Sequence, residues 1–220
     1  MHHKTAPSGA GEPAPETRGR VIRWARFYDL VAMLMSLGRA PAIRRMTVKM
    51  AKVVPGEVVL DVGCGTGTLT IAAKDRAGPT GQVHGIDASP EMIDVAREKA
   101  GKKGADVDFR VGLIEDIPFP DGQFDVVLSS LMLHHLPDDV KRQGFQEIRR
   151  VLKPDGRFLA IDLSPSGGVL GHLVQILGLH RGEGTLEEVS GMLTAAGFTA
   201  VQSGRTRYKV LWFVRAARGA

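Results

Sequence analysis

The feature that most restricts the fold of this chain is a short apolar run that ends in closely spaced glycines. The run 58–62 is apolar apart from its fourth residue, and Gly63, Gly65 and Gly67 follow at every second position. A helix-compatible run comes next, so the pattern predicts a strand, a tight turn and a helix. Glycine permits positive φ and close approach of a ligand to the backbone, and the amides at the following helix start can hold an anion.

The glycine spacing separates two common nucleotide-binding turns. A dinucleotide fingerprint requires glycine at the position of Thr68, whereas the chain reads D-V-G-C-G-T-G over residues 61–67. This stretch resembles motif I of the class I S-adenosylmethionine (SAM) methyltransferases. Cys64 occupies a turn position that needs a small residue, and no sequence partner marks it as a nucleophile.

A second acidic residue supports nucleoside binding. Residues 82–87 are predicted to form a short strand, and Asp87 closes it, 26 positions after Asp61. A carboxylate at the end of this strand can accept hydrogen bonds from both hydroxyls of a ribose. Because NAD would use the same residue, Asp87 does not choose between cofactors. Ser89 and the proline after it predict the start of the next helix.

Three later stretches also match the methyltransferase family. Residues 112–119 resemble its G-D-A-E-x-L-P-F segment, but Leu113 replaces the acid that bonds the adenine amino group, so a backbone carbonyl or Glu115 would take that role. Residues 124–135 (F-D-V-V-L-S-S-L-M-L-H-H) resemble the type 11 small-molecule group, which includes the quinone C-methyltransferases. Residues 152–159 (L-K-P-D-G-R-F-L) are the third match. The absence of an Asn- or Asp-Pro-Pro motif after the fourth strand argues against methylation of nucleobase or glutamine amino groups.

The region before the glycine turn divides into two parts. Residues 1–19 are rich in Pro, Gly, Ala and Glu and are predicted to be disordered. Residues 20–52 predict two helices, the second over about 42–53, with four methionines. They either pack on the core or form a lid over the substrate, and both roles are compatible. In the resembling family a Tyr-Asp pair like Tyr28-Asp29 often lies near the cofactor.

Four residues are candidates for a catalytic base. They are His134, His135, Asp162 and Tyr28, and the sequence does not rank them. Histidine titrates near neutral pH, and two adjacent histidines cannot both face one pocket from a strand. Asp162 ends the predicted fifth strand, on the ligand side of a parallel sheet. A base is needed only if the acceptor must lose a proton.

The last third of the chain completes the fold. Residues 167–180 predict an apolar helix that could close over the pocket; it is too short to span a bilayer, and peripheral membrane contact is the weaker interpretation. Thr185 predicts the start of the last helix, which ends at Gly197. Two strands, about 199–207 and 208–215, are expected to form an antiparallel pair.

Composition excludes several classes. The net charge of +5 is spread along the chain, so no nucleic-acid partner is expected. One cysteine permits no internal disulfide, and no run is long and apolar enough to span a bilayer, so a cytoplasmic protein is expected. No metal-binding cluster is visible, and the oligomeric state is open.

The resemblance implies an α/β protein with a Rossmann-like, seven-stranded, mostly parallel sheet, helices on both faces and an N-terminal helical lid. Residues 53–220 are expected to form the SAM-binding domain, which would transfer a methyl group to oxygen, nitrogen or carbon of a small, partly hydrophobic acceptor. An NAD-dependent oxidoreductase or a non-catalytic SAM-binding protein is the alternative. The resemblance implies these cofactor-binding residues: Tyr28, Asp61, Gly63, Cys64, Gly65, Gly67, Asp87, Ala88, Met92, Leu113, Ile114, Glu115, Ser129 and His134.

Overall fold

The computed structural model describes residues 17, 19, 38–163, 185–208 and 210–219. Within these ranges the strands are β1 (Val58–Val62), β2 (Gln82–Asp87), β3 (Asp108–Val111), β4 (Phe124–Ser130), β5 (Leu152–Leu163), β6 (Thr199–Arg205) and β7 (Leu211–Ala217). The helices are α2 (Ala40–Met50), α3 (Thr68–Ala77), α4 (Pro90–Lys103), α5 (Asp138–Val151), α7 (Leu186–Ala195) and the 3-10 helix η1 (Leu133–His135). The first helix expected in residues 20–52, Tyr28 and the segment 167–180 lie outside the described residues.

One seven-stranded sheet organises the molecule, in the order β3-β2-β1-β4-β5-β7-β6. The strands from β1 to β5 pair in parallel, and β7 runs antiparallel to both β5 and β6. Val62 lies opposite Ile86 of β2 and Ser129 of β4, so the carboxyl ends of three strands meet at one edge. The predicted mostly parallel, Rossmann-like sheet is confirmed. Its strand order reverses between β1 and β4, where such sheets bind ligands.

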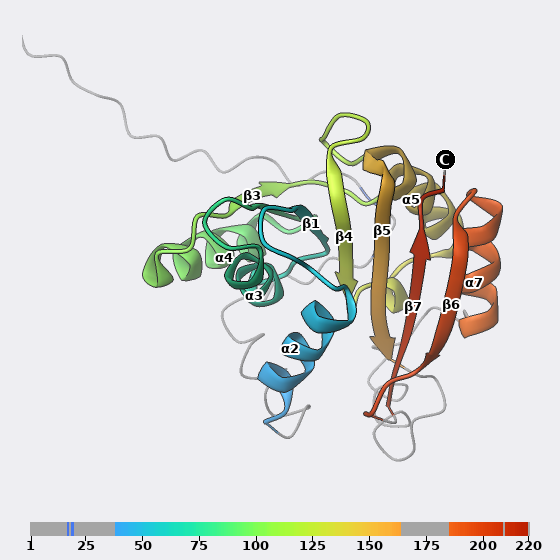
Figure 1. The fold of residues 1–220 in the computed structure, drawn as a ribbon, viewed down its shortest axis with the longest axis horizontal. Helices are drawn as coiled ribbons and strands as arrows, with labels where there is room; N and C mark the ends of the chain where they lie inside the picture. The colour runs from blue at the N-terminus through green and yellow to red at the C-terminus, as the bar shows by residue number, and fades with distance from the viewer. Residues whose placement is uncertain (1–16, 18, 20–37, 164–184, 209, 220) are drawn as a thin grey trace, which may run out of the picture.

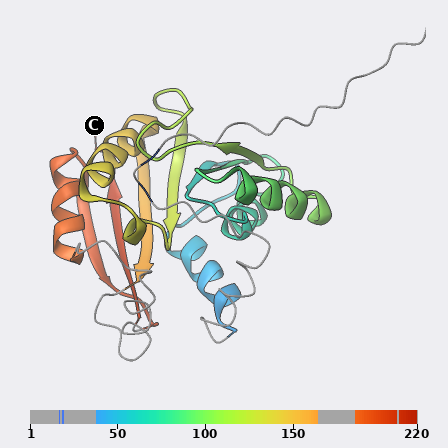
Figure 2. The same ribbon diagram turned by 180° about the vertical axis from the view of Figure 1, so that it is seen from behind.

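Helices cover both faces of the sheet. α2 and α3 lie in front of it in Figure 1, and α5 and α7 lie in front of it in the reverse view of Figure 2. Successive strand residues point to opposite faces. Val59 accordingly packs with α2 and α3, while Leu60 packs in the larger cluster with α5 and α7. Residues of α4 pack with Ile71 of α3 and Phe109 of β3 on the first face.

Helix ends follow the predicted capping signals. The Ser89 hydroxyl accepts the backbone N–H of Met92, and Pro90 occupies the first turn of α4. α7 begins with a capping box, in which the Thr185 hydroxyl accepts the Glu188 N–H and the Glu188 carboxylate accepts the Thr185 N–H. The sequence predicts these two helix starts because each cap depends on residues only three positions apart.

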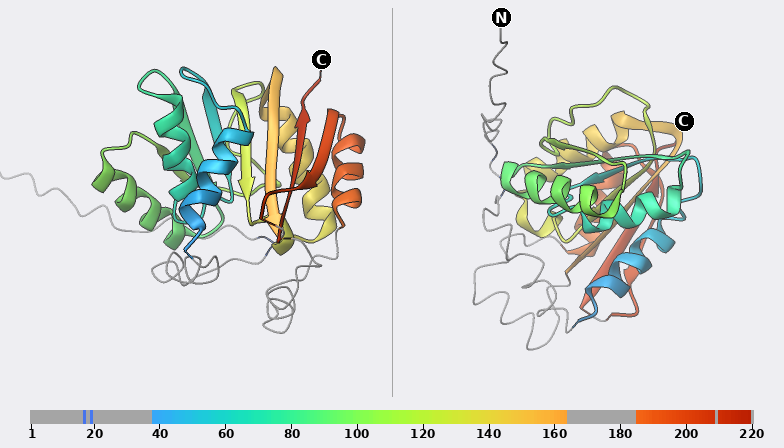
Figure 3. Two further views of the ribbon diagram at one scale, coloured as in Figure 1. Left: turned by 60° about the horizontal axis from the view of Figure 1, so that its bottom comes forward. Right: turned by 90° about the vertical axis from the view of Figure 1, so that its left-hand side faces the viewer.

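Both predicted ends of the second N-terminal helix need correction. The second N-terminal helix starts at Ala40 rather than residue 42 and ends at Met50 rather than Val53. Pro41 lies in its first turn, where a missing backbone N–H costs no helical hydrogen bond, so proline here starts the helix instead of delaying it. This helix packs on the sheet and beside α3, as Figure 3 shows.

The predicted turn at residues 153–156 is part of β5. Leu152 already pairs with Phe124 of β4, and pairing resumes at Arg157 with Val126, so the four residues between form an irregularity within one strand. At the end of the chain, the antiparallel pair is confirmed.

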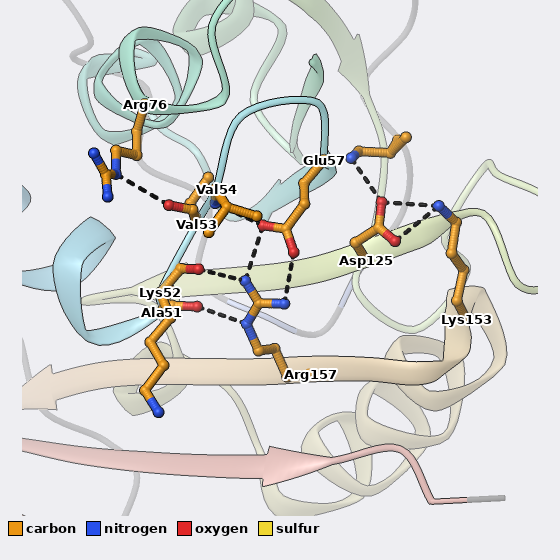
Figure 4. Close-up of polar contacts among 10 residues, drawn as sticks. Ala51, Lys52, Val53, Val54, Glu57, Arg76, Asp125, Lys153 and Arg157 are labelled. Atoms are coloured by element: carbon orange, nitrogen blue, oxygen red, sulfur yellow. Dashed lines mark hydrogen bonds and ion pairs between the residues drawn. The ribbon is translucent and has the colours of Figure 1, made fainter. Parts of the chain in front are cut away.

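A charged network fixes the C-terminal end of α2 to the sheet (Figure 4). The guanidinium of Arg157 bonds both carboxylate oxygens of Glu57 at 2.8 and 2.9 Å. It also donates to the backbone carbonyls of Ala51 at 2.7 Å and Lys52 at 2.8 Å. Arg157 is at the start of its strand segment, so this network lies at the opposite end of the strands from the edge where Val62 and Ser129 lie side by side.

Candidate functional site

A pocket lies at the carboxyl ends of β1, β2 and β4. It is lined by the glycine turn, the segment after β3 and the segment between β4 and α5, together with two residues near the N-terminus. The lining residues are Thr17, Gly19, Val62, Gly63, Gly65, Asp87, Ala88, Met92, Gly112, Leu113, Ile114, Glu115, Ser130, Leu131, Met132, His135 and Leu136.

The glycine turn forms one wall. The backbone amides of Gly63 and Cys64 both donate to the carbonyl of Ile86 at 2.9 Å, which ties the turn to the neighbouring strand. Gly63 has a φ of +73°, and a Cβ built on it would lie 2.4 Å from Cγ of Met132. A side chain here would therefore be strained and would also collide with the opposite wall. The bare backbone leaves room for the chain after β4 to pack directly on the turn.

Asp87 joins the turn to the start of α4. Its carboxylate accepts the Gly65 N–H at 2.8 Å and the Ser89 N–H at 3.0 Å through different oxygens. Burial raises the pKa of Asp87, and the two backbone hydrogen bonds partly offset this by favouring the charged form. The structure thus places a carboxylate with both oxygens anchored at the pocket wall, where a sugar could be hydrogen-bonded.

Asp61 and Ser129 are buried and are not among the residues that line the pocket. Asp61 Oδ2 accepts the Thr70 hydroxyl at 2.7 Å. Within the described residues, Asp61 Oδ1 and Ser129 Oγ are buried without a hydrogen-bond partner. Burial raises the pKa of Asp61 to about 7, and the nearby Asp87 contributes in the same direction. Each is adjacent in sequence to a lining residue, Val62 or Ser130.

Of the other predicted cofactor-binding residues, some line the pocket and others pack in the structure next to it. Cys64 and Gly67 do not line the pocket. Cys64 packs in the cluster beneath α3 and α4, where burial raises the pKa of its thiol. Gly67 has a φ of +72° and precedes α3; a Cβ there would lie 2.6 Å from the Phe109 ring. Ala88 and Met92, which the resemblance assigns to cofactor binding, are among the lining residues.

The segment after β3 forms a second wall. Leu113, Ile114 and Glu115 all line the pocket. The Glu115 carboxylate accepts the hydroxyl of Thr17 at 2.6 Å, so the described N-terminal residues reach the pocket across 98 positions of sequence. Thr17 falls in the range expected to be disordered, and no local pattern indicated this contact.

The catalytic candidates on η1 and β5 form one cluster. His134 Nδ1 lies 2.5 Å from Asp162 Oδ1, and the His134 backbone N–H donates to Asp162 Oδ2 at 3.1 Å. The rings of His134 and His135 lie 3.9 Å apart between centroids, at an angle of 44°. His135 lines the pocket, whereas His134 and Asp162 are buried behind it.

Three residues that follow Ser129 belong to the pocket and were not predicted from the sequence. Ser130, Leu131 and Met132 line the pocket, and Leu131 has a left-handed φ of +56°. A left-handed leucine costs about 1–2 kcal/mol, so the position is held by surrounding structure. Its backbone N–H donates to the Ile161 carbonyl at 2.9 Å. Nothing local in the sequence announces this conformation.

Two further observations apply to the described part of the chain. It contains no group of three or more His, Cys, Asp and Glu side chains that could hold a metal ion. Among its helices, none has both the length and the apolar character needed to cross a bilayer.

Comparison with known proteins agrees with this geometry. Residues 59–156 match the family described as "Methyltransferase domain". The ubiquinone/menaquinone biosynthesis C-methyltransferase of Burkholderia mallei is 38% identical over 153 residues, which are 70% of this chain and 62% of that protein. The chain therefore spans less than two thirds of the length of this relative.

Two solved structures share the fold. A SAM-dependent methyltransferase from Aquifex aeolicus is 26% identical, with a TM-score of 0.65 over 79% of this chain and 88% of that one. Phosphoethanolamine N-methyltransferase 2 of Haemonchus contortus, solved in complex with SAM, is 20% identical, with a TM-score of 0.69 over 81% of this chain and 53% of that one.

Proposed function

We propose that this chain, whose residues 59–156 match the family described as "Methyltransferase domain", is a SAM-dependent methyltransferase that transfers a methyl group to a small, partly apolar acceptor. The observation that supports the proposal most is the pairing of a bare glycine turn with the anchored carboxylate of Asp87 in one pocket. Leu131 and Met132 add apolar side chains to the lining of the same pocket.

The residues present fit this cofactor. Asp87 would hold the ribose hydroxyls, and the unpartnered oxygen of buried Asp61 suits a cationic ammonium close to the turn. Met92 and Ile114 would contact the adenine, and Glu115 is the acid available for the adenine amino group where the family residue is replaced by Leu113. SAM supplies a methyl group that is already activated by the positive sulfur.

The protein's own contribution is alignment and exclusion of water. Val62, Leu131, Met132 and Leu136 offer apolar surface around the reacting centre, where charge disperses during transfer. His135 is the pocket-lining imidazole that could accept a proton from the acceptor.

For the acceptor we infer a hydrophobic ring. Support comes from the apolar wall and from the relatives named as quinone biosynthesis C-methyltransferases. Incubation of the protein with methyl-labelled SAM and a panel of quinols, phenols and small amines tests this: label should enter quinols or phenols. Transfer only to amines would contradict the ring acceptor, and transfer to nothing while the protein binds SAM would favour a non-catalytic binding protein.

The oxidoreductase alternative has less support. Thr68 stands where a dinucleotide fingerprint has its third glycine, and it starts α3. The melting temperature of the protein should rise when SAM or S-adenosylhomocysteine is added, and should not rise with NAD. A larger shift with NAD would reverse the choice.

A further inference from the structure

A buried aspartate, Asp162, is hydrogen-bonded to His134, whose ring lies against that of the pocket-lining His135. Asp162 has no exposed surface, and Oδ1 is bonded to His134 Nδ1 at 2.5 Å and accepts the Leu163 N–H at 2.7 Å. Its other oxygen accepts the His134 backbone N–H at 3.1 Å. Burial by itself raises the pKa of Asp162, but the charge and hydrogen bonds of His134 outweigh it and lower that pKa. The carboxylate is thus held charged in the core.

Both ring and backbone of His134 are fixed by this carboxylate. A hydrogen bond at one imidazole nitrogen sets the tautomer and the ring orientation. The His134 side chain is only 7% exposed, so it is a poor candidate for direct contact with an acceptor. Its ring lies against that of His135, with centroids 3.9 Å apart.

His135 is the member of this cluster that reaches the pocket. It lines the wall beside Leu131 and Met132, and its backbone N–H donates to the Met132 carbonyl at 2.9 Å. Two other titratable side chains line the described pocket, Asp87 and Glu115. Both carry hydrogen bonds of their own, to backbone amides and to Thr17 respectively.

We propose that Asp162 is a positioning residue, which through His134 holds His135 as the general base for the acceptor. This inference rests on the proposed methyl transfer. The acceptor's O–H, N–H or ring C–H proton passes to an imidazole nitrogen of His135 and then to water. The methyl group takes the proton's place on the acceptor, and the bonding electrons of the broken carbon–sulfur bond remain on sulfur. One proton is released per methyl transferred, and no oxidant or reductant is required.

Chemical labelling of full-length protein with diethylpyrocarbonate, read by peptide mass spectrometry, tests the arrangement without any acceptor. In the wild type His135 should be modified several-fold faster than His134, and S-adenosylhomocysteine should protect it. Asp162→Asn should raise the labelling rate of His134 at least threefold and change that of His135, because the ring pair loses its anchor. His134→Gln, which can still donate to Asp162 but removes the ring beneath His135, provides a second variant if Asp162→Asn does not fold.

Turnover with 1,4-dihydroxynaphthalene as probe acceptor gives the catalytic readout. His135→Gln should lower kcat about 10²–10⁴-fold, the usual contribution of a positioned base. Asp162→Asn should lower kcat by about tenfold or more with little change in KM, and should alter the pH dependence of kcat.

Asp108→Asn is the matched control, because Asp108 pairs with His84 at 3.1 Å in a second His–Asp pair that does not line the pocket. It should leave the labelling of His134 and His135 unchanged. Faster labelling of His134 than of His135 in the wild type would overturn the proposal, as would a wild-type labelling rate of His135 in both Asp162→Asn and His134→Gln. Calorimetry with S-adenosylhomocysteine distinguishes failure of the proposed methyl transfer from failure of the proposed role of Asp162. If the wild type gives no binding heat, the proposed function is refuted, whereas the labelling rates still test whether Asp162 positions His134 and His135.

Discussion

At the scale of single residues, three aspartates of the site have different environments, and we therefore expect different roles for them. Asp87 lines the pocket with both oxygens engaged by backbone amides, Asp61 is buried with one oxygen unpartnered among the described residues, and Asp162 is paired with a histidine. The sequence predicted all three as site residues, Asp61 from the resemblance of its glycine turn to motif I, and Asp87 and Asp162 from their places at the ends of strands. It could not assign the environments, because burial and partners depend on segments distant in sequence.

Replacing Asp87 by alanine should weaken SAM binding by roughly 1.5–3 kcal/mol, because hydrogen bonds to a charged group are lost. Titration calorimetry measures the change. Asp94→Ala is the control, since its side chain is 77% exposed on α4 and makes only a 3.8 Å contact with Arg97. Equal affinity in wild type and Asp87→Ala would exclude Asp87 as the ribose ligand.

The buried Asp61 should make stability depend on pH. Its pKa is about 7 in the folded protein and near 4 when unfolded, so the folded state binds the proton more tightly. This contribution is present at low pH and is lost as pH rises through 7. The unfolding free energy of cofactor-free wild type should therefore fall relative to that of Asp61→Asn, by on the order of a few kcal/mol between pH 4 and 8. Urea titrations at several pH values measure it, and parallel pH curves would contradict the assignment.

At the scale of elements, the chain between β4 and α5 packs onto the glycine turn. Met132 lies over Gly63, and the preceding Leu131 takes a left-handed conformation that directs the chain into η1. The strand–turn–helix at 58–77 was predictable, because glycine spacing and apolar pattern are local. The contact of Met132 with the turn was not, since it follows from β1 and β4 being neighbours in the sheet.

Gly63→Ala should lower the unfolding free energy by about 1–3 kcal/mol, through a strained positive φ and the clash with Met132. Adding Met132→Ala should recover the clash component and leave the backbone strain, so the two changes should couple in a double-mutant cycle. Gly101→Ala is the control, because a Cβ there meets nothing within 4 Å. Additive losses in the cycle would show that Met132 does not press on the turn.

At the scale of the whole molecule, the Arg157 network and the pocket lie at opposite ends of the strands. The Arg157 network ties α2 and the start of β1 to β5, and the pocket lies beyond the carboxyl ends of β1, β2 and β4. Sequence pattern predicted the sheet, its mostly parallel character and the C-terminal antiparallel pair. It did not predict that residues near the N-terminus reach the pocket, because Thr17 meets Glu115 through a hydrogen bond that no periodicity records.

Arg157→Lys should lower the unfolding free energy by about 1–3 kcal/mol, because lysine cannot reproduce the planar fork that meets Glu57 and two carbonyls. SAM affinity should stay within twofold of wild type, since the network is remote from the pocket. Denaturant unfolding and calorimetry provide the two values. Arg76→Lys, which loses only one 3.1 Å bond to the Val53 carbonyl, should cost less. A large loss of SAM affinity in Arg157→Lys with an unchanged unfolding free energy would contradict this account, because it would show that the Arg157 network contributes to cofactor binding.

The measurement that bears most directly on the whole account is isothermal calorimetry of the purified chain with SAM, S-adenosylhomocysteine and NAD. The carboxylate of Asp87 predicts binding of a nucleoside cofactor, and the glycine spacing at residues 63–67, with Thr68 in place of a third dinucleotide glycine, predicts saturable binding of the first two and none of NAD. Heat from NAD alone, with none from the methyl donor or its product, would contradict the account.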